Sequence, residues 1–185
     1  MINRKKIIDS ILPANAYGCY FRLVEKEDAE FILSLRNNEK LSRYINPTSI
    51  DIQDQINWLL EYKIREEQGE DFYIICLKKD KVTKLGLNRI YDIKGDEFEI
   101  GSWVFSPDAG PNNAIFGDLF ARSLAYEQLQ FKICKIAVKK ENRPVLRYTK
   151  SFNPTLVGED ETSFYFELDY DTFKIRRDKL LKILN

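Results

Sequence analysis

The chain contains no histidine. Without imidazole it cannot assemble a Ser-His-Asp or Cys-His triad or a histidine-rich metal site. Any proton transfer must therefore use carboxylates, tyrosine, lysine, thiols or water. Net charge is absent as well, because 29 lysine and arginine residues balance 29 aspartate and glutamate residues. A general nucleic-acid binder normally carries a basic surplus, so we expect no nucleic-acid partner.

Cysteines and long apolar stretches are also scarce. The three cysteines, Cys19, Cys76 and Cys134, are odd in number and far apart, which predicts small buried side chains rather than disulfides or a metal site. No run approaches the roughly 18 apolar residues of a membrane-spanning helix, so we expect no membrane partner. The basic start, residues 1–9, leads into no apolar stretch typical of a signal peptide. These features predict a cytoplasmic protein without a bound metal.

Apolar and aromatic residues are plentiful, at 44% and 13% of the 185 residues. That content and length are typical of one ordinary domain with a substantial core. We expect an N-terminal extension at 1–18 and a main domain at 19–170. A C-terminal helix at 171–185 is expected to pack on the domain or on a partner.

Hydrophobic periodicity predicts alternating strands and helices. Strands are expected at 19–24, 72–77, 84–91, 97–105 and 133–138, with a last strand or hairpin at 155–169. Helices are expected at 26–37, after a turn at 46–49, after a loop at 107–113, at 144–152 and at 171–184. This order predicts an α+β fold with a mostly antiparallel sheet and a parallel β-α-β crossover in its second half.

Two patterns predict which side chains share a face. In the helix after residue 49, the apolar stripe consists of Ile52, Ile56, Leu59, Leu60 and Ile64. In the strand at 97–105, strict alternation places Glu97, Glu99, Gly101 and Trp103 on one face, with Phe98, Ile100, Ser102 and Val104 on the other.

Four segments carry a resemblance to a known family. Residues 21–29 read FRLVEKEDA, 98–104 read FEIGSWV, 124–129 read LAYEQL and 138–145 read VKKENRPV. Their order and spacing resemble the GNAT superfamily of acetyl-CoA-dependent N-acetyltransferases over roughly residues 19–169. The branch in question includes ribosomal-protein and amino-sugar N-acetyltransferases. The resemblance implies about six or seven strands flanked by helices, with acetyl-CoA bound at the β-α-β crossover.

The cofactor signature of that family, Arg/Gln-x-x-Gly-x-Gly/Ala, is missing, since residues 108–115 read DAGPNNAI. The expected helix start still offers free backbone N–H groups to a pyrophosphate at Asn112, Asn113 and Ala114. An ordinary turn and helix cap is the alternative interpretation. The resemblance further implies backbone contacts to the pantetheine arm from Ser102 and Val104, and a hydrogen bond from Asn142. A helix cap is the alternative role for Asn142.

The resemblance also implies catalytic roles. Glu99 is the expected general base, directly or through water, with Glu97 as the alternative; a solvent-facing carboxylate paired with lysine is the structural alternative. Tyr148 is the candidate for protonating the departing thiolate, or else a packing residue. Trp103 is expected either to wall the acceptor pocket or to belong to the core.

The implied activity is direct transfer of acetyl from acetyl-CoA to a primary amine of a small molecule or peptide. A nucleotide-linked amino sugar of surface-polysaccharide synthesis is the preferred acceptor. A protein N-terminus or a small amine is the alternative. A GNAT-fold binding module without catalysis remains open, because the pyrophosphate loop is altered. The chain is expected to be a monomer or a homodimer.

Overall fold

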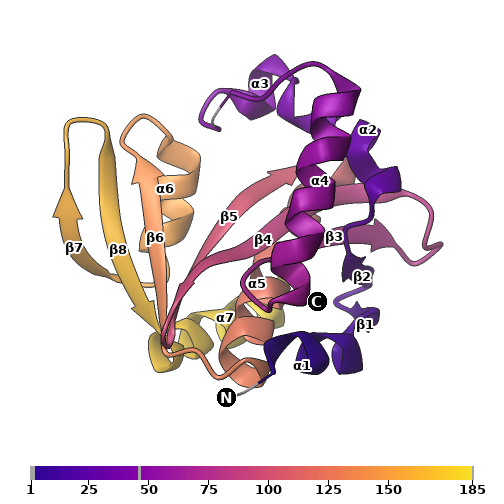
Figure 1. The fold of residues 1–185 in the computed structure, drawn as a ribbon. Helices are drawn as coiled ribbons and strands as arrows, with labels where there is room; N and C mark the ends of the chain where they lie inside the picture. The colour runs from indigo at the N-terminus through magenta and orange to yellow at the C-terminus, as the bar shows by residue number, and fades with distance from the viewer. Residues whose placement is uncertain (1–2, 46, 185) are drawn as a thin grey trace.

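The computed structural model describes residues 3–45 and 47–184. Over these ranges the strands form one eight-stranded sheet in the order β1-β2-β3-β4-β5-β6-β8-β7 (Figure 1). The strands are β1 (Ala14–Ala16), β2 (Cys19–Leu23), β3 (Phe72–Lys78), β4 (Lys84–Lys94), β5 (Glu97–Phe105), β6 (Ile133–Lys139), β7 (Thr155–Glu159) and β8 (Ser163–Asp169). The helices are α1 (Arg4–Ile11), α2 (Ala29–Arg36), α3 (Glu39–Ser42), α4 (Ile52–Glu67), α5 (Pro111–Ser123), α6 (Arg143–Lys150) and α7 (Tyr170–Leu184).

Neighbouring strands are antiparallel except for β5 and β6, which run parallel and are joined through α5. This confirms the predicted α+β class and the crossover. The described sheet has one strand more than the six or seven predicted, because the short strand β1 extends its edge. Residues 155–169 form the hairpin β7–β8, which is one of the two predicted alternatives.

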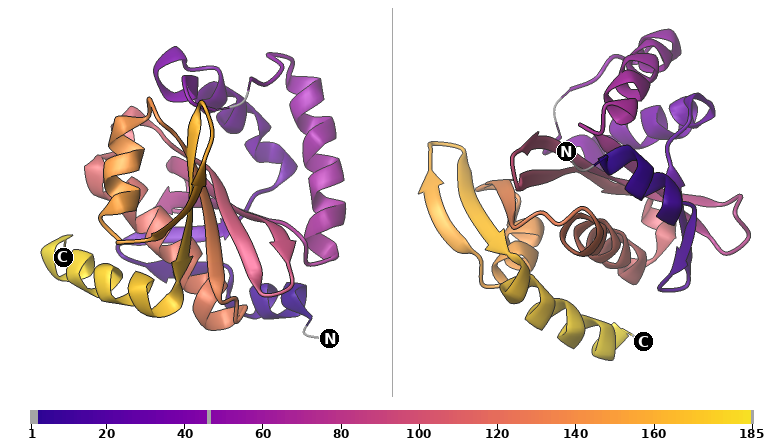
Figure 2. Two further views of the ribbon diagram at one scale, coloured as in Figure 1. Left: turned by 90° about the vertical axis from the view of Figure 1, so that its left-hand side faces the viewer. Right: turned by 60° about the horizontal axis from the view of Figure 1, so that its bottom comes forward.

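Two apolar cores lie on opposite faces of the sheet. The larger one packs α1, α5 and α7 against one face, and the smaller one packs α2 and α4 against the other (Figures 1 and 2). Ile8 of α1 and Phe173 of α7 are both fully buried in the larger core. The N-terminal segment and the C-terminal helix therefore pack on the sheet. All three cysteines are free and buried, as predicted. No helix in residues 3–45 and 47–184 is long and apolar enough to span a bilayer.

Helix α4 buries a different face from the one its apolar stripe predicts. Its buried residues are Gln55, Leu59, Tyr62 and Glu66. Leu60 and Ile64 are exposed instead. The reason is a polar contact that the pattern does not encode: the Tyr62 hydroxyl donates to Glu66 Oε2 at 2.5 Å and accepts from the Tyr73 backbone N–H at 2.8 Å. These bonds satisfy buried polar groups, so this face turns toward the sheet.

Strand β5 carries a β-bulge that overturns the predicted alternation. Ser102 has φ +47°, and Ser102 and Trp103 together lie opposite Asn88. The additional residue reverses the order of faces beyond it. Trp103 consequently packs into the larger core and Val104 into the smaller one. The prediction that Trp103 shares a face with Glu99 is therefore wrong.

Candidate active site

Strands β5 and β6 are paired along only a short stretch. The register joins Glu97 to Ile133, Phe98 to Cys134 and Glu99 to Lys135. Beyond these pairs the two strands diverge, as Figure 1 shows. A diverging edge leaves backbone N–H and C=O groups of β5 for a ligand to pair with. The predicted cofactor-contact residues Ser102 and Val104 lie on this part of β5.

Helix α5 begins close to the end of β5, after a short 3-10 turn and Gly110, which has φ +81°. Its first turn contains the predicted residues Asn112, Asn113 and Ala114. The N–H groups of a first turn have no partner within the helix, and the helix dipole makes this end attractive to anions. The Asn113 side chain folds back, donating to the carbonyl of Ala109 and accepting from Cys19 Sγ at 3.2 Å. The backbone is thus what the first turn offers to an anion.

Asn142 caps helix α6. Its Oδ1 accepts from the Val145 N–H at 3.4 Å, which confirms the cap interpretation. The neighbouring carbonyl of Glu141 accepts from the Tyr44 hydroxyl at 3.1 Å. This bond links the segment after α3 to the loop between β6 and α6, across the opening between the two diverging strands. The contact of Asn142 with the cofactor stays a prediction.

Tyr148 belongs to a buried polar network between α5, α6 and β6. Its hydroxyl donates to Asp118 Oδ2 at 2.8 Å, and Arg122 Nε contacts Asp118 at 2.9 Å. Arg122 Nη1 also lies 2.9 Å from Cys134 Sγ. Burial, and secondly the Asp118 carboxylate, raise the pKa of Tyr148 well above its usual value. Its proton is committed to Asp118, which weighs against the predicted role in protonating a thiolate.

Trp103 connects the same two helices. Its Nε1 donates to the carbonyl of Ala114 at 2.8 Å, and its ring centroid lies 5.0 Å from that of Tyr148. The bulge therefore directs Trp103 toward α5 and α6 rather than toward the face of Glu99. The geometry therefore does not support the predicted contact of Trp103 with the acceptor.

The two candidate bases differ in their partners. Glu97 forms an ion pair with Lys135, in line with the structural alternative considered for a carboxylate on this strand. Glu99 lies in the last pair before the strands diverge, and its Oε2 accepts from the Tyr91 hydroxyl at 2.8 Å. Burial and the nearby Glu99 carboxylate raise the pKa of Tyr91, so its phenol stays neutral. Of the two carboxylates, Glu99 is the one that lies where the strands begin to diverge, and its role as a base stays a prediction.

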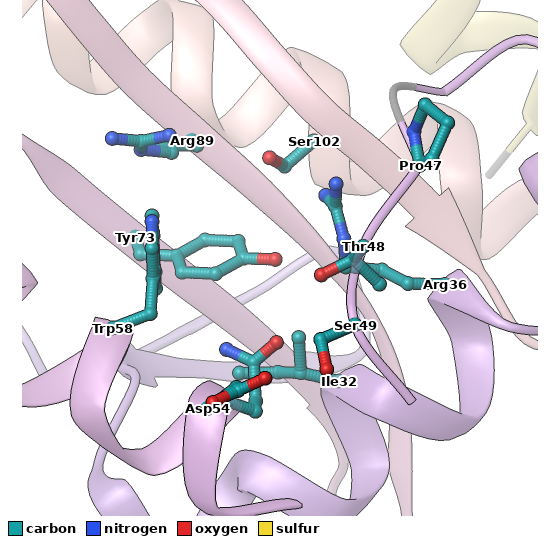
Figure 3. Close-up of a pocket in the computed structure, with 11 residues that line it drawn as sticks. Ile32, Arg36, Pro47, Thr48, Ser49, Asp54, Trp58, Tyr73, Arg89 and Ser102 are labelled. Carbon is teal, nitrogen blue, oxygen red and sulfur yellow. The ribbon is translucent and has the colours of Figure 1, made fainter. Parts of the chain in front are cut away.

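A cavity of about 370 Å³ opens on the α4 face of the sheet (Figure 3). Helices α2 and α4, the loop at 47–49 and strands β3, β4 and β5 surround it. Its lining includes Ile32, Arg36, Asp54, Trp58, Tyr73, Arg89 and Ser102. The volume lies in the range of small-molecule sites, roughly 300–1,000 Å³. Among the described residues, no cluster of cysteine, aspartate and glutamate could hold a metal ion.

Arg89 is held rigidly at one side of this cavity. Its Nε donates to Asp71 Oδ1 at 2.7 Å, and a second bond joins Nη2 to the other carboxylate oxygen. Arg65 also contacts Asp71, at 3.2 Å. The Arg89 guanidinium lies 4.9 Å from the centroid of the Trp58 ring. Bidentate pairing and ring stacking fix its orientation.

Sequence reasoning missed the cavity and the buried network. Tyr73 lies in an apolar run, and Arg89 lies in a strand where nothing marks it as buried. The spacing of Asp118 and Arg122 does predict an i, i+4 pair on a helix, but not its burial. The cavity residues come from two helices, three strands and a loop, so no local pattern brings them together.

Comparisons with known proteins agree with this geometry. A family model described as "Acetyltransferase (GNAT) domain" matches residues 19–152. The structure of apo FdhC, described as a nucleotide-linked sugar GNAT, aligns with a TM-score of 0.83 and 30% identity, covering 94% of this chain and 99% of that one. A search of curated protein sequences finds no match.

More distant structures share the fold. A ribosomal-protein-S5-alanine acetyltransferase from Vibrio fischeri aligns with a TM-score of 0.74 at 13% identity, covering 87% of this chain and 98% of that one. A mutant spermidine N-acetyltransferase from Vibrio cholerae aligns with a TM-score of 0.69 at 14% identity, covering 85% and 97%.

Proposed function

Because this chain belongs to the GNAT family of N-acetyltransferases, we propose that it transfers acetyl from acetyl-CoA to the amine of a nucleotide-linked amino sugar. The observation that carries the proposal is the cavity with two arginines, which lies on the other face of β5 from the N-terminal end of α5. The 30% identity to a nucleotide-linked sugar GNAT over nearly both chains supports the same acceptor class.

The cofactor side would use mainly backbone groups. The first turn of α5 suits the pyrophosphate of acetyl-CoA, and the unpaired edge of β5 at Ser102 and Val104 suits the amides of the pantetheine arm. In the loop before this turn Gly110 adopts φ +81°, and the Asn113 side chain is tied back to Ala109. Asn142 is the proposed further contact. The bound thioester supplies the acetyl group.

The acceptor side would use the cavity. Arg36 and Arg89 suit the negative charges of a nucleotide diphosphate. The same positive charges lower the pKa of an amine placed among them, which favours the neutral, nucleophilic form. Two arginines beside the Asp54 carboxylate suit an anionic nucleotide better than a polycation such as spermidine, which supports the nucleotide-linked acceptor over the small-amine alternative. The single-step reaction then needs only removal of one proton from the attacking nitrogen.

Glu99 is the proposed acceptor of that proton, directly or through water. It lies where β5 and β6 begin to diverge, and its Tyr91 partner donates a hydrogen bond without neutralising its charge. Tyr148 is the proposed anchor of α6, since its hydroxyl is committed to Asp118. The departing thiolate would take its proton from the solvent or from the Glu99 carboxyl after that group has accepted the proton of the nitrogen.

A panel of amines tests the function. Thiol release from acetyl-CoA and the mass of the product are measured with UDP-glucosamine, dTDP-linked 3-amino and 4-amino sugars, free glucosamine, spermidine and an alanine-starting peptide. We expect turnover with at least one nucleotide-linked amino sugar and a lower kcat/KM with every other amine. Efficient acetylation of only spermidine or the peptide would refute the acceptor class. Absence of both turnover and acetyl-CoA binding would instead favour the binding-module alternative.

A further inference from the structure

The hydroxyl of Tyr73 is buried and makes no hydrogen bond of good geometry, although Ser102 and Arg36 lie beside it. Tyr73 is 1% exposed, and its Oη is one of two buried side-chain atoms without a partner in the described part of the chain. Other buried tyrosines are satisfied, since Tyr62 donates to Glu66 and Tyr126 to the carbonyl of Leu168. Leaving a buried polar group unpaired is costly, so such an atom requires an explanation.

The ring of Tyr73 is fixed in its orientation. It packs edge-to-face against Trp58 and Tyr62, with both pairs of centroids 6.0 Å apart and planes at 82°. Its backbone N–H is bonded to the Tyr62 hydroxyl. Figure 3 shows the phenol oxygen directed into the cavity, toward the side where Thr48 and Arg36 lie. The hydroxyl therefore cannot turn elsewhere, and whatever fills the cavity meets it.

A phenol offers this cavity something that its charged groups do not. Burial raises the pKa of Tyr73, so the group is neutral and can both donate and accept a hydrogen bond. Arg36 and Arg89 can only donate, which suits phosphate and hydroxyl oxygens. The carboxylate of Asp54 would favour an amine in its protonated, unreactive form. The phenol oxygen can accept an N–H bond without stabilising that charged form.

We propose that Tyr73 Oη accepts a hydrogen bond from the amine of the acceptor and so positions that amine at the β5 side of the cavity, beside Ser102. This rests on the proposed function, because it takes the cavity as the amino-sugar site. Tyr73 thereby distinguishes an amino sugar from the same sugar with no nitrogen. An acceptor without a matching group leaves the buried phenol unpaired.

The test compares two proteins, wild type and Tyr73→Phe, each with two ligands, a sugar nucleotide that carries the amine and one that lacks it. Tyr73→Phe removes only the hydroxyl, and Tyr165→Phe is the matched control, because that hydroxyl bonds Asp160 in the hairpin β7–β8. Binding is measured by calorimetry for the best amino sugar of the panel and for glucose linked to the same nucleotide. Steady-state kinetics and acetyl-CoA binding are measured in parallel, with thermal unfolding as the check on folding.

We expect Tyr73→Phe to lower kcat/KM for the amino sugar by roughly tenfold or more, the usual scale for one lost buried hydrogen bond. Acetyl-CoA binding should be unchanged. Thermal stability and affinity for the amine-free sugar nucleotide should not fall, because the hydroxyl is unpaired in both of those states. Tyr165→Phe should behave as wild type. If the amino sugar is acetylated but Tyr73→Phe weakens both sugar nucleotides equally, or neither, the Tyr73 inference is overturned while the function stands. If no amino sugar of the panel is acetylated, the function fails and the inference fails with it.

Discussion

Replacing Asp118 with asparagine should destabilise the protein severely. Asp118 is fully buried in α5 and is the carboxylate that contacts Arg122, whose side chain is 7% exposed. Asparagine keeps the shape but removes the charge. Arg122 also contacts the Cys134 thiol, but burial raises the pKa of that thiol to about 11, so it is neutral near pH 7 and cannot replace the counter-charge.

The expected magnitude follows from this burial. Removing one partner of a buried ion pair typically costs about 3–5 kcal/mol, because the remaining charge stays desolvated. Asparagine keeps only one acceptor oxygen for the Tyr148 hydroxyl and Arg122, which adds to the cost. For a domain of this size, such a loss corresponds to a drop of about 6–20 °C in Tm. Replacing both charges with apolar residues, as in D118L/R122M, should recover most of the loss.

Urea unfolding at pH 7, followed by circular dichroism, measures both effects. The urea midpoints of wild type, Asp118→Asn and the double variant are compared. If their m-values are the same, the differences in midpoint report differences in stability. The affinity of the folded Asp118→Asn variant for acetyl-CoA then shows whether α5 and α6 keep their relative positions. A loss below about 1 kcal/mol for Asp118→Asn would contradict the reasoning, since that is the scale of an exposed pair.

Three further substitutions probe other parts of the molecule. Glu99→Gln should lower turnover of an amino sugar more than about tenfold while leaving acetyl-CoA binding intact; an unchanged pH–rate profile would remove it from the mechanism. Asp28→Asn should lower the free energy of unfolding at pH 7. Burial by itself would raise the pKa of Asp28, but the hydrogen bond from Arg22 outweighs it together with the other contacts, so the pKa is lowered in the folded protein. A lowered folded pKa contributes stability above the unfolded value of about 3.9 and loses it as pH falls through the folded pKa. Urea unfolding should therefore show a smaller difference from wild type at pH 3 than at pH 7, and an equal difference would count against the ion pair. Gly117→Ala should lower Tm despite the helix preference of alanine, because a Cβ there would lie 2.4 Å from Phe105 Cζ; overpacking of this kind costs about 1–3 kcal/mol, and an unchanged Tm would show that the ring can move aside.

Much of the fold could be read from the sequence because strands and helices repeat with different periods. The predicted strand at 97–105 has the same bounds as β5. Its faces were predicted wrongly from Ser102 onward, since a positive φ at a serine is a local distortion that the residue pattern does not indicate. One inserted residue was enough to move Trp103 from the acceptor side to the side of α5.

The site was predictable where one segment determines it and unpredictable where several converge. The start of α5 was found, because a loop followed by a periodic apolar segment predicts a helix terminus. The partners of Tyr73 and Arg89 come from distant strands and helices, and their burial depends on the tertiary packing of α4. The polar face of α4 shows why: Tyr62 and Glu66 are buried by their bonds, although both residues would be placed outside on hydropathy alone.

The proposed pyrophosphate loop differs from the family signature, because Asn113 stands where a glycine is expected. Glycine at a phosphate-binding turn leaves space because it has no side chain. Asn113 carries one, but its amide donates to Ala109 and accepts from Cys19 of β2, so the side chain is tied into the protein. A tethered amide leaves the first-turn N–H groups of α5 in place at the helix terminus, where the dipole favours an anion. The physical requirement for binding a pyrophosphate is space beside the backbone, and we propose that this chain meets it by restraining a side chain instead of omitting one.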